Sequence, residues 1–285
     1  MARSEKNLTA VFTDTASAIR AKTGTTEAIC PLDFADKINA IETGGTGVGM
    51  KEFIEAGLKF AYSNNTTFDN IIQYSDTENV TDFSRFFYET HNLTDYPNVD
   101  FSKATATNSM FYNSGIVHAG PINTSSNLTY PGAMFQGCSN LKDVQILDMS
   151  SVTNASSMFR NCYALETVEI TNIESASNIV FADFMFSECR NISEIPAFDF
   201  ANLNPNSTSG IFSGCRSLKF IHCKNIGFNL YIKSSTLFTR EALLEIINNL
   251  QTVTSTMKLT MGETNLAKLT DEDKAIATNK GWTLA

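Results

Sequence analysis

The middle of the chain repeats one arrangement of large apolar residues among polar ones. Two adjacent apolar residues, here named the apolar pair, recur as Phe86-Phe87, Met110-Phe111, Met134-Phe135, Met158-Phe159, Met185-Phe186 and Ile211-Phe212. The spacing between successive apolar pairs is 24 in the first three steps, then 27 and then 26. A period in the twenties predicts a solenoid, in which each unit stacks on its neighbour because it cannot close a core alone.

A second apolar pattern follows each pair and predicts a short strand. Seven residues after the first member of each pair stand Leu93, Val117, Leu141, Leu165, Ile192 and Leu218. From these positions the pattern apolar-x-x-apolar-x-apolar continues, clearly in Leu141-Val144-Ile146, Leu165-Val168-Ile170 and Leu218-Ile221-Cys223, and weakly in Ile192-Ile195-Ala197 and Val117-Gly120-Ile122. The final alternation is typical of a strand that shows one face to a core. Because Ser, Thr or Asn precedes it, the apolar pair itself predicts a short helical turn on the opposite wall.

Four of the six cysteines occupy one repeat position, four residues after the first member of the apolar pair. They are Cys138, Cys162, Cys189 and Cys215, and the matching residues in the first two units are Thr90 and Ser114. A position that accepts Cys, Ser or Thr requires a small side chain, and free cysteine packs as a small hydrophobe. No C-x-x-C motif is present and the three histidines lack ligand spacing. We therefore expect a structural ladder of reduced thiols, with no metal and no cofactor.

The predicted repeat core follows from these two patterns. It consists of Phe87, Phe111, Phe135, Phe159, Phe186, Phe212, Leu141, Leu165 and the four repeat cysteines.

The N-terminal residues predict two short amphipathic helices within residues 1–43. Their apolar faces carry Leu8, Val11, Phe12 and Ile19 in the first helix and Phe34, Ile38 and Ile41 in the second. Residues 44–50 are glycine-rich and predict a flexible linker. They do not match a phosphate-binding loop, because no strand precedes them and no Gly-Lys-Ser/Thr follows. The helix pair could cover the open end of the repeats, but the linker favours an assembly interface.

The repeat region is expected over residues 51–235, followed by a cap over residues 236–285. The stretch "TREALLEIINNL" predicts a helix capped by Thr239, "MKLTMG" a strand, and "LTDEDKAIATNKGW" a second helix capped by Thr270 and ending near Gly281. Repeat arrays need such a terminal cover with a polar outer face.

Composition narrows the function classes. The 285 residues include only 18% charged residues and carry a formal net charge of -9, which disfavours nucleic-acid binding. No window of about 18 apolar residues predicts membrane insertion. No apolar stretch of signal-peptide length follows the first residues, so we expect synthesis and assembly in the cytoplasm.

No catalytic signature is evident. Ser213, in "GIFSGC", does not match a nucleophile elbow. Asp183 and Glu188 could pair as glycosidase carboxylates, but both fall where solvated residues are expected. Tyr112, Tyr130 and Tyr163 form a candidate ligand face, although half-buried packing is the commoner role of such tyrosines.

The segment "MSSVTNASSMFRNCYALETVEI" resembles the BspA-like leucine-rich repeat, and the likeness extends over about residues 80–223. This resemblance implies an α/β repeat fold: a short leucine-rich-repeat-like parallel solenoid, with the N-terminal helical pair and a C-terminal α/β cap. It also implies adhesion or binding, on cell surfaces or in phage tails. The C-terminal stretch "TNLAKLTDEDKAIATNKGW" is similar to the closing module of repeat-bearing surface and phage tail proteins.

The N-terminal segment resembles a motif of tail and baseplate proteins from phages of Gram-positive bacteria. The matching residues are Ala18, Ile19, Arg20, Lys22, Thr23, Gly24, Phe34, Ala35 and Ile38. The resemblance implies a non-enzymatic virion component of a tail, baseplate or tail fibre. It implies other virion proteins and further copies of the chain, as a trimer, as partners, and a host cell-wall carbohydrate or surface protein as the target. The alternatives are a bacterial surface adhesin and, with less support, a carbohydrate-active enzyme.

Overall fold

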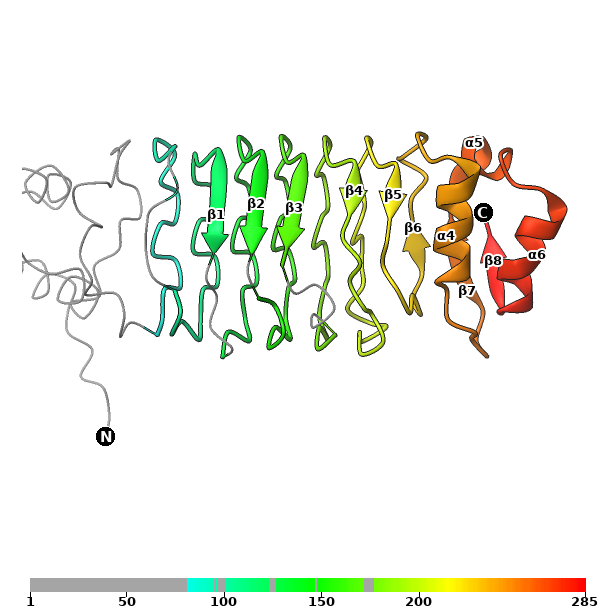
Figure 1. Cartoon of the computed structure of the whole chain (residues 1–285), viewed down its shortest axis with the longest axis horizontal. Helices are drawn as coiled ribbons and strands as arrows, with labels where there is room; N and C mark the ends of the chain where they lie inside the picture. Colours follow the sequence, from blue (N-terminus) through cyan, green and yellow to red (C-terminus); the bar gives the residue numbers. More distant parts are fainter. Residues whose placement is uncertain (1–80, 95, 97–100, 123–126, 147, 172–176) are drawn as a thin grey trace, which may run out of the picture.

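The computed structural model describes residues 81–94, 96, 101–122, 127–146, 148–171 and 177–285. The expected helical pair, the linker and the first part of the repeat region lie outside the described residues. So do the seven proposed interface residues Leu8, Val11, Phe12, Ile19, Phe34, Ile38 and Ile41. In Figure 1 the described chain runs as successive coils that lie side by side along one axis, and the C-terminal helices close the far end.

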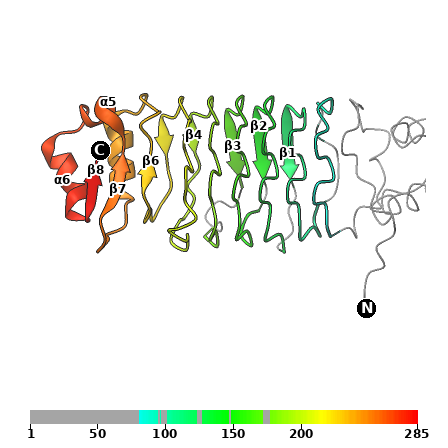
Figure 2. The ribbon, with the colours of Figure 1, turned by 180° about the vertical axis from the view of Figure 1, so that it is seen from behind.

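Short strands in consecutive units pair in parallel. Strands β1 (His118–Ile122), β2 (Asp143–Ile146) and β3 (Thr167–Ile170) form one sheet in that order. Strands β4 (Glu194–Ile195) and β5 (Phe220–Ile221) form a second. Figure 2 shows from behind that β1, β2 and β3 are neighbours. Between β2 and β3 the register joins Val144 to Val168 and Ile146 to Ile170, which are equivalent positions of consecutive units. The sequence period is therefore the offset between paired strands.

The phenylalanines that end the apolar pairs stack in a single buried column. The ring centroids are 5.0, 5.4, 5.8, 5.2 and 6.1 Å apart, taken in order along Phe87, Phe111, Phe135, Phe159, Phe186 and Phe212. Each of these side chains is 2% exposed or less. Leu141 and Leu165 are fully buried in the same hydrophobic core as this column. Each stacked pair stabilises the folded protein by about 0.5–1.5 kcal/mol beyond what burial of the apolar surface contributes.

The four repeat cysteines are buried and free. Each thiol donates to the carbonyl oxygen of the column phenylalanine one unit earlier, at 2.9 Å from Cys138 to Phe111 and 3.0 Å from Cys162 to Phe135. Cys189 and Cys215 make the same bond to Phe159 and Phe186. Burial raises the pKa of all four thiols, to about 12 for Cys138 and Cys215.

The helical turn expected at the apolar pair is wrong. Residues two before and two after the column phenylalanine adopt left-handed backbone conformations in every unit, as Ser157 (φ 57°) and Asn161 (φ 63°) do around Phe159. The N–H groups of Ser157, Phe159 and Asn161 donate to carbonyl oxygens of the next unit, at 2.7–2.9 Å. A helix would use these N–H groups within the unit. Here these alternate N–H groups point toward the next unit, while those of Met158 and Arg160 donate within their own unit at 3.1 Å, so this wall also bonds one unit to the next.

Two strand positions were also predicted wrongly. In the second unit the buried residues are Ile116 and Ala119, whereas Val117 and Gly120 are only half-buried. Ala119 pairs with Val144, so the two paired residues are one position further apart in sequence than the repeat period. The register then shifts within β1, and Ile122 pairs with Ile146 at the repeat period. A one-residue shortening before β1 is thus compensated by a bulge inside it.

In the fifth unit, Phe198 replaces the half-buried Ala197 as the buried residue after β4. The two-residue strand ends at Ile195, so the strict alternation used for the prediction does not continue to residue 197.

The C-terminal region continues the parallel pairing and adds helices. Strands β6 (Leu230–Tyr231), β7 (Met257–Thr260) and β8 (Trp282–Leu284) form a parallel sheet in that order. Helix α4 (Arg240–Asn248) connects β6 to β7, and helices α5 (Gly262–Leu266) and α6 (Asp271–Asn279) connect β7 to β8. The N-cap predicted at Thr239 is confirmed, since its side chain accepts a hydrogen bond from the Ala242 N–H.

Polar contacts join the two long cap helices. Thr270 and Asp273 form a capping box at the start of α6, and Asp273 also accepts two 2.7 Å bonds from Arg240. Lys280 donates from Nζ to the carbonyl oxygens of Ile247, Asn248 and Leu250. Lys280, at the C-terminal end of α6, therefore satisfies carbonyl groups at the end of α4.

Candidate functional site

The strand side chains that do not enter the core form the outer face of the first sheet. Burial alternates along β2 and β3, so Val144 and Val168 point inward while Gln145 and Glu169 are exposed. Parallel pairing without a shift between β2 and β3 aligns equivalent outward residues across the strands. Polar side chains from different units are therefore neighbours on this face.

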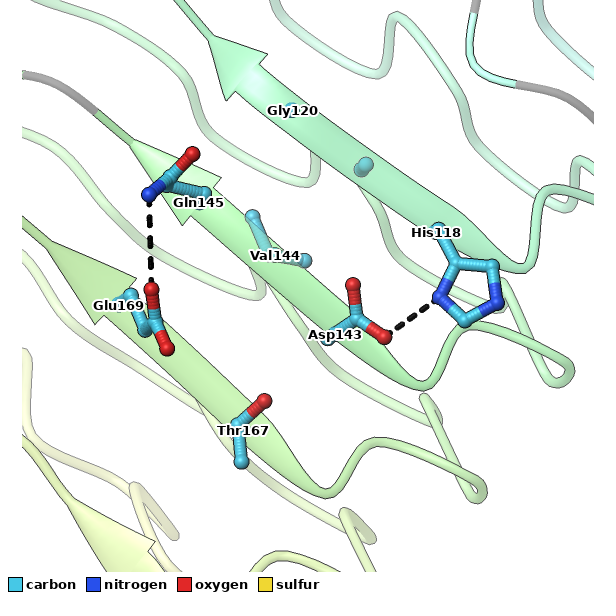
Figure 3. Close-up of a pocket in the computed structure, with 8 residues that line it drawn as sticks. His118, Gly120, Asp143, Val144, Gln145, Thr167 and Glu169 are labelled. Atoms are coloured by element: carbon cyan, nitrogen blue, oxygen red, sulfur yellow. Dashed lines mark hydrogen bonds and ion pairs between the residues drawn. The ribbon is translucent and has the colours of Figure 1, made fainter.

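These side chains border a groove of about 300 Å³, here named the strand-face groove. Its lining residues are His118, Ala119, Gly120, Asp143, Val144, Gln145, Thr167 and Glu169. One rim carries the first outward residue of each strand, His118, Asp143 and Thr167, and the other carries Gly120, Gln145 and Glu169 (Figure 3). The strand backbone at Ala119 and Val144 forms the floor, because both side chains are buried in the core beneath it.

A polar contact orients the side chains along each rim. His118 Nδ1 lies 2.5 Å from Asp143 Oδ2, and the two side chains are 66% and 48% exposed. On the other rim, Gln145 Nε2 donates to Glu169 Oε2 at 3.5 Å (Figure 3). Each contact engages one oxygen of a carboxylate, so the groove presents carboxylates whose orientation is already restricted.

Glycine at position 120 keeps one corner of the groove free of a side chain. Its φ of 128° lies in the region that favours glycine. A Cβ atom there would lie 2.6 Å from the Gln145 carbonyl oxygen, which is closer than real Cβ contacts. The bulge in β1 and the open corner of the groove therefore depend on the same residue.

A second polar cluster lies between β4, β5 and helix α4. His222 Nδ1 is 2.6 Å from Glu245 Oε1 of α4, and Nε2 is 3.2 Å from Glu194 Oε1 of β4. The Phe220 ring stacks on the imidazole with centroids 5.8 Å apart. Both ring nitrogens thus have carboxylate partners, and the cluster joins the last repeats to the cap.

Sequence reasoning missed both histidine sites because it compared the histidines only with one another. Their partners are acidic residues of neighbouring units or of the cap, such as Asp143 in the unit after that of His118 and Glu245 in α4. His118 and Asp143 stand 25 positions apart, about one repeat period, so the sequence offers the pair as a candidate without showing that the side chains touch.

The structure does not bring the three candidate tyrosines together. They occupy three different repeat positions in three different units. Tyr112 is half-buried and stacks on Tyr88 at 4.8 Å, Tyr130 is 44% exposed, and Tyr163 is 38% exposed beneath the Arg190 guanidinium at 4.5 Å. These three side chains therefore do not share one surface column.

The two carboxylates weighed as a catalytic pair each have a local partner. Asp183 accepts a 2.9 Å bond from the Ser209 N–H, and Glu188 forms a 2.9 Å ion pair with Arg190. Asp183 therefore has a hydrogen-bond partner in the next unit, and Glu188 has an ion-pair partner in its own unit.

Phe184 is an exposed aromatic residue that the repeat pattern did not single out. It is 36% exposed and has a left-handed φ of 57°, which is uncommon for a bulky residue. The Arg160 guanidinium lies 4.8 Å from its ring centroid. A Cβ atom at Gly210 would come within 3.0 Å of the ring, so glycine leaves space for it.

The described part of the chain shows neither a metal-binding cluster nor a membrane-spanning helix. Within it, no cluster of three or more His, Cys, Asp or Glu side chains could hold a metal ion. None of its helices is long and apolar enough to cross a membrane.

The repeated turns, the stacked column and the parallel strands define a repeat protein. The family described as "Mycoplasma protein of unknown function, DUF285" matches residues 56–124 and 118–225, more than half of the chain, and the chain belongs to this family. The family is one of BspA-like repeats. Neither the curated proteins nor the solved structures contain a significant match to the chain.

Proposed function

We propose that this protein is a non-enzymatic binding component of a phage virion, in a tail, baseplate or tail fibre. Its repeats would form a short leucine-rich-repeat-like parallel solenoid closed by the C-terminal α/β cap. The solenoid would contact the host surface or neighbouring subunits. The observation that carries the binding role is the strand-face groove, which three successive strands border with oriented polar side chains.

The division between interior and surface supports a display role. Inside, the column phenylalanines stack on those of the next unit, and the repeat cysteines donate hydrogen bonds to the preceding unit. Outside, equivalent positions differ in chemistry from unit to unit, as His118, Asp143 and Thr167 do. A scaffold of this kind holds the surface rigid while the surface residues vary, which suits recognition.

The virion assignment is supported by the resemblance of residues 18–24 and 34–38 to phage tail and baseplate proteins. In this proposal the N-terminal segment attaches the chain to other virion proteins and to two further copies of itself. The repeats then project toward a cell-wall carbohydrate or a surface protein of the host.

The proposal is tested by locating the protein in purified particles. Particles are banded on a density gradient, treated with protease to remove adsorbed protein, and analysed by mass spectrometry for peptides of this chain. We expect the chain at a fixed ratio to the major tail protein. Recovery in host envelopes, with none in protease-treated particles, contradicts a virion role.

A bacterial surface adhesin is the second candidate. It is favoured by the family match, because the family's description names Mycoplasma proteins rather than phage proteins. The same fractionation separates the two, since an adhesin is found in the envelope of cells that carry no phage.

A further inference from the structure

We infer that the strand-face groove binds a small hydroxyl-rich ligand, one or two sugar rings in size, through hydrogen bonds from both rims. The inference rests on the proposed binding function and names the ligand class of that same site.

The dimensions of the groove favour a small, ring-sized ligand. Its volume of about 300 Å³ is at the lower end of the range for ligand pockets in proteins, about 300–1,000 Å³. The rims are separated by two residues along each strand, or about 6.6 Å, and neighbouring strands lie about 4.8 Å apart. This spacing suits a compact group with polar atoms on several sides, rather than a helix.

The rim side chains include both hydrogen-bond donors and acceptors, so they favour a ligand that both donates and accepts hydrogen bonds. Asp143 and Glu169 supply acceptors, while Thr167 and Gln145 supply donors and acceptors. The only apolar side chains of the lining, Ala119 and Val144, are buried beneath the floor. An apolar ligand would remove the rim groups from water without replacing their bonds, which costs free energy. Sugar hydroxyls replace those bonds on both rims.

The carboxylates are placed for hydroxyl recognition more than for capture of one cation. They stand on opposite rims and in different strands, Asp143 in β2 and Glu169 in β3. Each already has a donor neighbour, His118 at 2.5 Å or Gln145 at 3.5 Å. A single ammonium group would meet one carboxylate and leave the opposite rim without a partner. Several hydroxyl groups on one ring reach both rims.

The open corner at Gly120 gives the ligand its entry. Every other outward position of the array, at residues 118, 143, 145, 167 and 169, carries a polar side chain. The glycine lets a ring lie against the backbone of β1 while its hydroxyls face Gln145 and Asp143.

The test is a ligand titration on the full chain. Saturation-transfer NMR and calorimetry are run with glucose, galactose, rhamnose, N-acetylglucosamine and their β-linked disaccharides. Lysine amide serves as the cation probe. We expect saturable binding of at least one sugar, with lysine amide bound more weakly than that sugar.

The variants Thr167→Val and Glu169→Gln each remove one bonding function with little change in shape. Each is expected to weaken sugar binding about five-fold or more, the usual effect of one lost hydrogen bond. Glu166→Gln is the matched control, because Glu166 is exposed just before β3 and does not line the groove. It should leave the affinity within two-fold. Thermal unfolding curves confirm that all three variants are folded.

Three results would overturn the inference: no saturable response to any sugar, sugar binding unchanged in the Thr167→Val, Glu169→Gln double variant, or stronger binding of lysine amide than of every sugar. None of these bears on whether the chain is found in particles. Conversely, groove-dependent sugar binding by a chain absent from particles would retain the inference and contradict the virion role.

Discussion

The thiol of Cys162 donates a 3.0 Å hydrogen bond to the carbonyl oxygen of Phe135, a residue of the preceding unit. Phe135 in turn stacks on Phe159, which belongs to the same unit as Cys162. The thiol ladder and the phenylalanine column thus join the same two units at adjacent points. Cys138, Cys189 and Cys215 repeat the bond, so loss of one contact leaves its neighbours in place.

Alkaline pH should destabilise the protein through these thiols. The folded pKa of Cys138 and Cys215 is raised by burial from the ordinary 9.0 to about 12. Their contribution is fully present below pH 9 and is lost as pH rises toward 12, because only the unfolded chain ionises easily in that window. The free energy of unfolding, measured by urea titration, should fall with a slope of about 1.4 kcal/mol per pH unit for each thiol.

The variant Cys138→Ser, Cys215→Ser supplies the comparison for this window. Serine occupies the same repeat position at Ser114, so the hydroxyl fits the ladder. The stability of the variant should decline less steeply than that of the wild type above pH 9. Parallel curves would show that other groups cause the alkaline loss.

Glycine at a left-handed position should stabilise the repeat. Ser157 has a φ of 57°, which costs an L-residue about 1–2 kcal/mol relative to the right-handed region. Ser157→Gly should therefore raise the free energy of unfolding by up to about 1 kcal/mol, after the entropy of the unfolded glycine is subtracted. Ser156→Gly is the control at the neighbouring residue, which is also half-buried and lacks a positive φ. Equal effects of the two changes would argue against backbone strain at Ser157.

Truncation of the central phenylalanine should cost far more than loss of an exposed tyrosine. Phe135 is fully buried between Phe111 and Phe159. Phe135→Ala should lower the free energy of unfolding by about 3–5 kcal/mol through lost burial and a cavity. Tyr130→Ala, at a side chain 44% exposed, should change it by about 0.5 kcal/mol or less. Denaturant unfolding measures both, and similar losses would mean that the column is not the main source of stability.

Acid should weaken the cap through Asp273. Hydrogen bonds from Arg240, and then from the Thr270 backbone, hold the pKa of Asp273 below its ordinary 3.8. The stabilisation is present above pH 3.8 and is lost as pH falls below it. Arg240→Gln should therefore lower the melting temperature at pH 7, and the difference from wild type should shrink below pH 4.

Calorimetry at several pH values measures this effect. Arg216→Gln is the control, since Arg216 is exposed and lies outside the cap. A difference between Arg240→Gln and wild type that is independent of pH down to 3 would exclude the proposed role of the ion pair.

The spacing of apolar residues predicted which side chains are neighbours, but not the backbone conformation between them. Phe111, Phe135 and Phe159 follow one another at the repeat period and stack in the structure. The left-handed turns around them were missed because apolar spacing does not report the sign of φ. A signal was present: Asn113 and Asn161 share one repeat position with Gly137 and Gly214, and these residue types favour left-handed backbone.

Register within one unit was equally hidden from the sequence. Val117 and Ile116 are both apolar, so the pattern alone chose the wrong one as the buried residue. Pairing of β1 with β2 decides between them, since a strand shifted by one residue would turn its core face outward.

The period, the column of phenylalanines, the cysteine position and the cap helix after Thr239 are local or periodic features, so the sequence by itself determined them. Tertiary structure alone decided which polar residues meet on the outer face. His118 and Asp143 touch because parallel strands align residues one unit apart, and Gly120 leaves its corner open because β2 passes too close for a side chain. Contacts of this kind depend on the distance between coils, and no spacing along a single chain specifies that distance.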